Sequence, residues 1–216
     1  MAPPELAAAT LKGAPAPHLR AAVVLSCLVV LALLALQVVL HGPVTALDQA
    51  VTLHFAQTRD PAITAVMRVV SSLHQTWKVL LGTAVIAAVL ALRGQWLSVR
   101  ALVVVPAGML LNVALKNTFQ RPRPHWDDPL VQLATYSFPS GHAVASTVFH
   151  GMLCAIVFAH TRSRGWRALA VALSAGMIAL VCFSRVYLGA HYPSDVVAGT
   201  AEGLACVLLC VRLLRR

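Results

Sequence analysis

The sequence predicts an all-α integral membrane protein, a bundle of six spanning helices with a polar site at the outer ends of the third to sixth. Composition is the first observation: 59% of the 216 residues are hydrophobic and only 11% are charged, whereas a soluble domain carries about 25% charged residues. The mean hydropathy is +0.78. The second observation is that the apolar residues gather in six long runs bounded by charges, Pro or Gly. Both exclude a soluble fold.

Each run is interpreted as one span, although several are shorter than the ~20 residues that a span normally needs. The runs occupy residues 21–40, 77–92, 97–115, 143–159, 167–183 and 196–211. The second is the weakest, since a run as short as Val79 to Leu92 could also be a buried core helix. Trp77 and Trp96 flank it and fit the aromatic belt of a span. Between the first two runs, the mixed stretch from Val44 to Ser71 predicts a helix lying partly in the membrane interface.

The distribution of positive charge predicts the topology, because Lys and Arg accumulate in short cytoplasmic loops. With the N-terminus inside, ten of the 17 cations are cytoplasmic, and three of the other seven belong to the site described below. Both termini are therefore placed in the cytoplasm. Residues 1–20 are expected to be a disordered cytoplasmic tail and residues 21–216 a single membrane domain. A cleaved signal peptide is the alternative for the first run, but such peptides have apolar cores of about 7 to 15 residues.

Side chains suited to binding phosphate lie at the ends of the last four runs. Lys116 ends the third run, residues 140–142 begin the fourth, Arg185 ends the fifth and Asp195 begins the sixth. Because consecutive spans alternate in direction, all of these ends lie on one side of the membrane. The sequence therefore predicts one site at the outer face.

Three cations in this set suit phosphoryl transfer, in which charge spreads over three equatorial oxygens and catalysis is chiefly positioning and electrostatic stabilisation. They are Lys116, Arg123 and Arg185, and the planar fork of Arg can contact two oxygens at once. Any one alone could be a snorkelling interface cation. Ser140 and Gly141 open a helix, where free N–H groups, a hydroxyl and the helix dipole favour an anion. Ser140 could also serve only as an N-cap.

His191 is the candidate nucleophile, because one imidazole nitrogen can attack phosphorus while the other donates a proton to a carboxylate. Asp195, four residues later, can accept that hydrogen bond and fix the tautomer. His142 would protonate the leaving oxygen and then activate water. The same three side chains could instead hold zinc. The adjacent cations argue against a metal, because they would repel it and already neutralise phosphate oxygens. No metal and no cofactor are expected.

Three spaced elements resemble the signature of the type 2 phosphatidic acid phosphatase (PAP2) superfamily. The K-x6-RP element is matched by Lys116 with Arg123-Pro124, and the PSGH element by the four residues that end with His142. The SR-x5-H-x3-D element is matched by Ser184-Arg185, His191 and Asp195. All are intact and in order, over about eighty residues. The resemblance implies a metal-independent membrane phosphatase in which His191 forms a phosphohistidine, His142 acts as acid and base, and the cations bind phosphate.

The resemblance, combined with a site on the outer face, implies a lipid phosphate or diphosphate as substrate. Undecaprenyl diphosphate is favoured, since that carrier lipid is released at the outer leaflet of the bacterial plasma membrane, where we expect this protein to face the periplasm. The alternatives are a phosphatase for phosphatidylglycerophosphate, phosphatidic acid or lipid A, or a lipid phosphotransferase. The sequence does not indicate which lipid is bound or the oligomeric state.

Other protein classes fit less well. An anionic lipid transporter would show repeats and midplane sites, and neither is evident. A vanadate-dependent haloperoxidase has a similar site but is soluble. The net charge of +10 does not indicate a nucleic-acid partner, because the basic residues form neither a patch nor the pattern of a nucleic-acid-binding module. Two residues outside the motifs stay open. Glu202 could be functional, protonated or paired with Asn112. Arg121 could help hold an acidic head group, or Asp127 and Asp128 could neutralise it locally.

Overall fold

The computed structural model describes residues 17–126, 129–131 and 133–213, and its regular structure there is helical. The helices, in order, are α2 (Pro17–Val39), α3 (Pro43–Gln57), α4 (Pro61–Leu73), α5 (Thr76–Leu92), α6 (Trp96–Ala101), α7 (Val104–Phe119), α8 (Gly141–His160), α9 (Arg164–Tyr187) and α10 (Pro193–Leu213). The tail predicted for residues 1–20 falls mostly outside the described residues. Its last four residues begin α2.

Among the described residues, five stretches are long and apolar enough to cross a membrane unaided. They are His18–Val39, Trp96–Phe119, Gly141–His160, Arg164–Tyr187 and Pro193–Val211. The remaining predicted span, residues 77–92, corresponds to α5 and is the one that the sequence supported least. Helix α5 meets the criterion only together with α4, and the axes of the two helices are bent by 51° relative to each other. The all-α membrane bundle is thereby confirmed.

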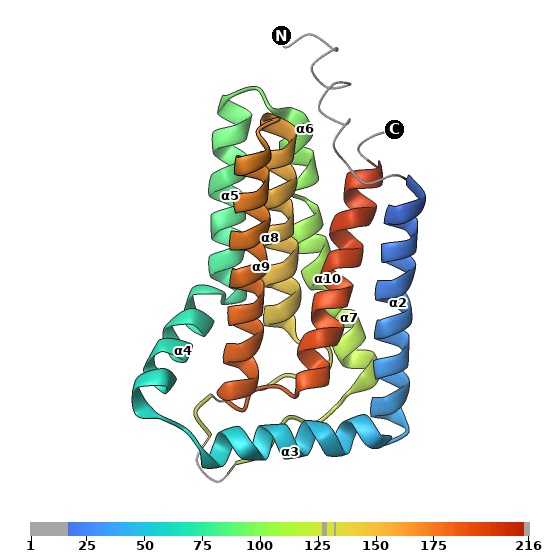
Figure 1. Ribbon diagram of the computed structural model, residues 1–216, viewed down its shortest axis with the longest axis vertical. Helices are drawn as coiled ribbons and strands as arrows, with labels where there is room; N and C mark the ends of the chain where they lie inside the picture. The colour runs from blue at the N-terminus through green and yellow to red at the C-terminus, as the bar shows by residue number, and fades with distance from the viewer. Residues whose placement is uncertain (1–16, 127–128, 132, 214–216) are drawn as a thin grey trace.

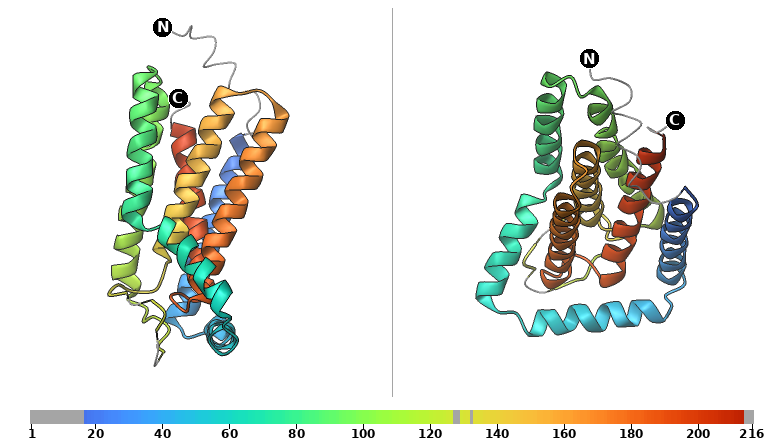
Figure 2. Two further views of the ribbon diagram at one scale, coloured as in Figure 1. Left: turned by 90° about the vertical axis from the view of Figure 1, so that its left-hand side faces the viewer. Right: turned by 45° about the horizontal axis from the view of Figure 1, so that its top comes forward.

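The helix α8 lies at the centre of the bundle and packs against α5, α7, α9 and α10, while α2 packs against α10. The start of α2 and the end of α10 lie at one end of the molecule (Figure 1). At the other end α3 runs crosswise beneath the bundle, as both views in Figure 2 show. The helix expected between Val44 and Ser71 is confirmed, as two helices. Its place at a membrane surface stays a prediction.

Helices α8 and α10 approach closely because two glycines of α10, four positions apart, face α8. A Cβ atom on Gly199 would lie 2.6 Å from the carbonyl oxygen of Ser140, and one on Gly203 would lie 2.8 Å from Cβ of Thr147. Small residues at this spacing let helices in membranes pack backbone to backbone. The contact brings the N–H of Ser140 within 2.9 Å of the backbone oxygen of Asp195. Two segments of the predicted site are thus joined by packing.

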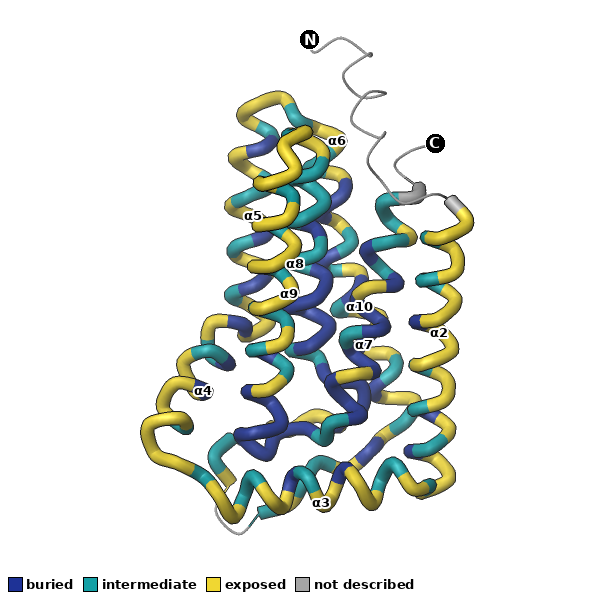
Figure 3. The backbone as a smooth tube through the Cα atoms, viewed as in Figure 1, coloured by how far each residue is buried: buried dark blue, intermediate teal, exposed yellow. Residues whose placement is uncertain are grey.

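Burial differs between the two ends of the bundle. Buried residues gather where α8, α9 and α10 approach α3, whereas α2 and the outer face of α5 are largely exposed (Figure 3). The exposed residues on the outside are apolar, for example Leu25 at 63% and Leu110 at 70% exposure. The fully buried side chains include charged ones such as Arg185 and Asp195. An apolar exterior around a polar interior is the arrangement expected of a protein in a bilayer.

Candidate active site

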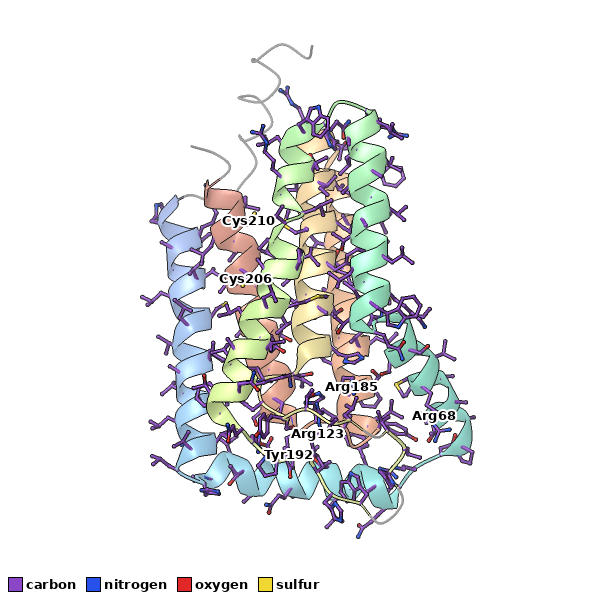
Figure 4. The ribbon with its side chains drawn as sticks, turned by 180° about the vertical axis from the view of Figure 1, so that it is seen from behind. Arg68, Arg123, Arg185, Tyr192, Cys206 and Cys210 are labelled. Carbon is purple, nitrogen blue, oxygen red and sulfur yellow. The ribbon has the colours of Figure 1, made fainter. Side chains whose placement is uncertain are left out.

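The structure brings the predicted site residues together at the end of the bundle nearest α3. There the end of α7, the start of α8, the end of α9 and the start of α10 converge, and the chain between α7 and α8 crosses beneath them. In Figure 4, Arg123, Arg185 and Tyr192 lie at this end, while Cys206 and Cys210 lie farther along α10. The four helix ends therefore lie together, as expected from alternating spans, and the placement of this end on the outer face stays a prediction.

His191 lies in the short connection between α9 and α10 and is 1% exposed. Its Nδ1 is 3.4 Å from Oδ2 of Asp195, and its Nε2 is 3.0 Å from Nη1 of Arg123. Burial, followed by the charges of Arg123, Arg185 and Lys116, lowers the pKa of His191 well below its ordinary value of 6.5. The ring is therefore neutral at physiological pH. With the proton on Nδ1, the lone pair of Nε2 faces the cations.

Asp195 is fully buried and is held by several donors besides His191. Its Oδ1 accepts a hydrogen bond from Nη1 of Arg121 at 2.6 Å. Its Oδ2 accepts from the backbone N–H of Tyr192 at 2.9 Å and from the hydroxyl of Ser137. These donors fix the orientation of the carboxylate.

The guanidinium of Arg123 is fixed by backbone carbonyls on both sides of the site. Its Nε donates to the oxygen of Thr135 at 2.6 Å, Nη2 donates to the oxygen of Tyr136 at 3.1 Å, and Nη1 donates to the oxygen of Ala190 at 2.7 Å. Burial lowers the pKa of Arg123. These bonds tie the α7–α8 connection to the segment that carries His191, and they hold the positive charge of Arg123 beside that ring.

The other two cations come from helices. Nζ of Lys116, in α7, donates to the oxygens of Tyr136 at 2.6 Å and Ser137 at 3.3 Å. Arg185, in α9, is 1% exposed, and its Nη1 donates to the hydroxyl of Ser71 in α4. Its Nε and Nη2 are buried without a hydrogen-bond partner among the described residues. Buried donors of this kind are rare and call for an explanation.

The start of α8 also presents unused polar groups. Ser140 occupies the N-cap position, but its side chain makes no capping hydrogen bond, and its Oγ is buried without a partner in the described part of the chain. The N-cap role alone therefore does not account for this serine. At Gly141 a Cβ atom would lie 3.2 Å from Oδ1 of Asn112 and 3.7 Å from Cε of Lys116. The first turn of α8, with its free N–H groups, is packed closely against Lys116.

His142, in the same turn of α8, is half-buried. It interacts electrostatically with Arg185, His191 and Arg123. The predicted acid–base residue thus lies beside the predicted nucleophile and two of the three cations.

Arg121 is the residue whose expected role the structure changes. We expected it to hold an acidic head group, but its Nη2 lies 2.8 Å from Oδ2 of Asp48 and its Nη1 lies 2.6 Å from Oδ1 of Asp195. Its guanidinium is 4.1 Å from the centroid of the Tyr192 ring. Burial would lower the pKa of Arg121, but Asp195 and Asp48 outweigh it and raise the pKa. The head-group expectation is wrong because Arg121 binds two carboxylates of the protein.

Comparison with known proteins decides the family, since residues 97–216 match the model of the PAP2 superfamily. The chain belongs to the PAP2 superfamily. It is 36% identical over 118 residues to phosphatidylglycerophosphatase B of Bacillus subtilis, an alignment that spans 54% of this chain and 58% of that relative. It is 38% identical over 109 residues to the lipid A 1-phosphatase of Rhizobium etli, spanning 46% of this chain and 42% of that one.

A solved PAP2 structure has the same arrangement of helices. The transmembrane PAP2-type phosphatidylglycerolphosphate phosphatase from Bacillus subtilis superposes with a TM-score of 0.81 at 27% identity, over 88% of this chain and 94% of that one. The family expectation from the three motifs is therefore confirmed.

Sequence reasoning on this PAP2 chain missed several buried residues of the site, namely Ser137, Ser194 and Asp48, and Asp48 is the most distant in sequence. It lies in α3, 73 positions before Arg121, and outside the segment that matches the family model. A lone aspartate in a mixed stretch carries no sequence signal for such a contact. The predicted pairing of Glu202 is confirmed, since Nδ2 of Asn112 donates to its Oε2 at 3.1 Å and to the oxygen of Pro139 at 3.3 Å.

A metal site was the rival use of His142, His191 and Asp195. Across the described ranges, no three His, Cys, Asp or Glu side chains are grouped so that they could hold a metal ion. Metal independence remains a prediction for this PAP2 site, and the experiment that tests it is given below.

Proposed function

We propose that this chain is a membrane phosphatase that hydrolyses the terminal phosphate of a lipid phosphate or diphosphate through a covalent phosphohistidine at His191. One observation carries the proposal: the neutral ring of His191 turns Nε2 toward Arg123 and Nδ1 toward a buried Asp195. A nucleophile activated by a fixed carboxylate beside fixed cations is what phosphoryl transfer requires.

The phosphate would be held by groups whose hydrogen-bonding capacity the protein does not use. These are Nε and Nη2 of Arg185 and the hydroxyl of Ser140, with the free N–H groups at the start of α8. Lys116 and Arg123 would add positive charge near the transferred oxygens. Gly141 would let the helix terminus lie close to the anion, and a side chain there would crowd Oδ1 of Asn112.

The reaction would proceed in two displacements. Nε2 of His191 attacks phosphorus, the bond from phosphorus to the leaving oxygen breaks, and His142 gives its proton to that oxygen. Asp195 stabilises the positive charge that develops on the His191 ring. Water then attacks the phosphohistidine, His142 takes a proton from this water, the P–N bond breaks and phosphate is released. His142 thereby recovers the proton it lost.

The lipid class follows from the membrane-embedded fold and the named relatives. Undecaprenyl diphosphate remains our first candidate, because a site at the outer leaflet would meet that lipid as it is released. Phosphatidylglycerophosphate is the second, supported by the likeness to a phosphatidylglycerolphosphate phosphatase at a TM-score of 0.81. The charge bias of the loops supports cytoplasmic termini and a periplasmic site in a bacterial plasma membrane.

The deciding experiment measures phosphate release from undecaprenyl diphosphate, phosphatidylglycerophosphate, phosphatidic acid and lipid A, each in detergent micelles. The wild type should release phosphate from at least one, and His191→Ala should not. His125→Ala is the matched control, since His125 is an exposed histidine of the same connection. Quenching in alkaline denaturant, which preserves a P–N bond, after reaction with phosphate-labelled substrate should trap label on the wild type and on His125→Ala but not on His191→Ala. Equal release by wild type and His191→Ala would refute the nucleophile, and binding without release would favour a transporter.

A further inference from the structure

We infer that Asp48 and Arg121 form a positioning pair that fixes the carboxylate of Asp195 behind the nucleophile, which makes the crosswise helix α3 part of the catalytic unit. This rests on the phosphatase function proposed above. Asp48 is 1% exposed and lies in α3. Its Oδ1 accepts the backbone N–H of Ser194 at 2.9 Å, and its Oδ2 accepts from Nη2 of Arg121 at 2.8 Å.

The contact with Ser194 locates the start of α10. Ser194 directly precedes Asp195, and its hydroxyl also donates to Oδ2 of Asp48. Nη1 of Arg121 donates to the same serine hydroxyl at 2.8 Å. One buried carboxylate in α3 therefore fixes both the backbone that carries Asp195 and the arginine that binds it.

Arg121 bridges the two carboxylates with its two terminal nitrogens. Asp48 takes Nη2, Asp195 takes Nη1, and the ring of Tyr192 lies over the guanidinium at 4.1 Å. A guanidinium is planar and presents its donors in a rigid fork. With one nitrogen bound on each side and one face covered, Arg121 cannot turn away from Asp195.

The pair also sets the charge behind the nucleophile. As Nε2 of His191 bonds to phosphorus, positive charge develops on the ring, and Asp195 must remain negative to stabilise it. Arg121 alone would neutralise Asp195. Because Asp48 supplies a second negative charge, the three side chains together carry a net charge of −1. Arg121 can then orient Asp195 without cancelling it.

The test compares Asp48→Asn with Thr52→Val in purified full-length protein. Thr52 lies one turn farther along α3, is also 1% exposed, and its hydroxyl contacts only α3 backbone among the described residues. Asp48→Asn should lower kcat on the order of tenfold, since small misplacements of catalytic groups have effects of up to about 100-fold, and should leave KM nearly unchanged because Asp48 does not touch substrate. Thr52→Val should keep wild-type kcat.

A second comparison separates positioning from general loosening. In an Asp195→Asn background, whose residual activity is measured, Asp48→Asn should have no further effect, because it acts through Asp195. Arg121→Lys keeps the positive charge but cannot bridge both carboxylates, so it should lose as much kcat as Asp48→Asn. If Asp48→Asn does not elute as a monodisperse protein in size-exclusion chromatography, Arg121→Lys takes its place in both comparisons.

The possible failures are distinguishable. The positioning pair is overturned if Asp48→Asn keeps the wild-type kcat, or if it lowers kcat by the same factor in the wild-type and the Asp195→Asn backgrounds. Either result leaves the proposed phosphatase function intact. A wild type that releases no phosphate from any of the lipids would overturn the proposed function and the pair together.

Discussion

Replacing Arg185 with methionine should remove activity and raise stability at the same time. The side chain is 1% exposed, and its hydrogen-bond partner is the neutral hydroxyl of Ser71. Within the described residues, no carboxylate lies within 4 Å of its guanidinium. A buried charge without a counterion costs folding free energy, and a protein retains such a charge when function requires it.

The size of the effect follows from two opposing terms. Burying a charge costs several kcal/mol even after relaxation, whereas losing a hydrogen bond that involves a charged group costs about 1.5–3 kcal/mol. Methionine is flexible and can fill much of the vacated volume. We therefore expect a net stabilisation of about 1–3 kcal/mol. For a chain of this size, each kcal/mol raises Tm by roughly 2–4 °C. Activity should fall by about 10²–10³, the usual effect of removing one preorganised donor.

Thermal unfolding in detergent, followed with a thiol-reactive dye, would measure the stability term. Arg68→Met is the matched control, because Arg68 is exposed on α4 (Figure 4), and its Tm should stay near the wild-type value. Inorganic phosphate should raise the Tm of the wild type and of Arg68→Met, but not that of Arg185→Met. An Arg185→Met protein that unfolds at a lower temperature than the wild type would show that the charge stabilises the fold, contrary to this reasoning.

Three further predictions concern pH, packing and metals. As the pH falls below 6.5, the wild type should lose stability faster than His191→Asn, by up to about 1.4 kcal/mol per pH unit. The reason is that the imidazole of His191 binds a proton in the unfolded chain but stays neutral when buried. Parallel curves of Tm against pH for the two proteins from pH 8 to pH 5 would contradict this. Gly199→Ala should cost about 1–3 kcal/mol and reduce activity, since its Cβ would lie 2.6 Å from the oxygen of Ser140, whereas Gly176→Ala, with open space at its Cβ, should fold and work normally. Activity should survive EDTA, and a loss that Mg²⁺ or Zn²⁺ restores would revive the metal site.

The spans and the gathering of the site residues at one end of the bundle could be predicted because both depend on strong local signals. Long apolar runs, charge at their ends and alternating direction place Lys116, His142, Arg185 and Asp195 at one end without any knowledge of packing. The motif spacings then select these residues from among many interface cations. The confirmed pairing of Glu202 was accessible for the same reason, since a lone carboxylate inside a span needs a partner.

The segment between the first two spans was harder to predict, because its structure is set by contacts distant in sequence. Asp60 begins α4 by accepting hydrogen bonds from Ala62 and Ile63, a local signal that could have been identified. The 51° bend between α4 and α5 and the contact of Asp48 with Arg121 have no such signal. The partners of Arg121 could not be predicted, because the acids near it in sequence are Asp127 and Asp128, whereas those it binds are Asp48 and Asp195.

The segment formed by α3 and α4 reaches the site at three points, which suggests why catalysis should depend on it. Asp48 contacts the start of α10, the backbone N–H of Asp60 donates to the hydroxyl of Tyr187 at 2.9 Å, and Ser71 accepts from Arg185. Two of the three contacts therefore fall on the end of α9 that carries Arg185, the arginine proposed to bind phosphate. None of the contacting residues in α3 and α4 lies within the stretch that matches the family model. Substitutions here should therefore change kcat through the geometry of Asp195 and Arg185, although the family motifs themselves stay intact.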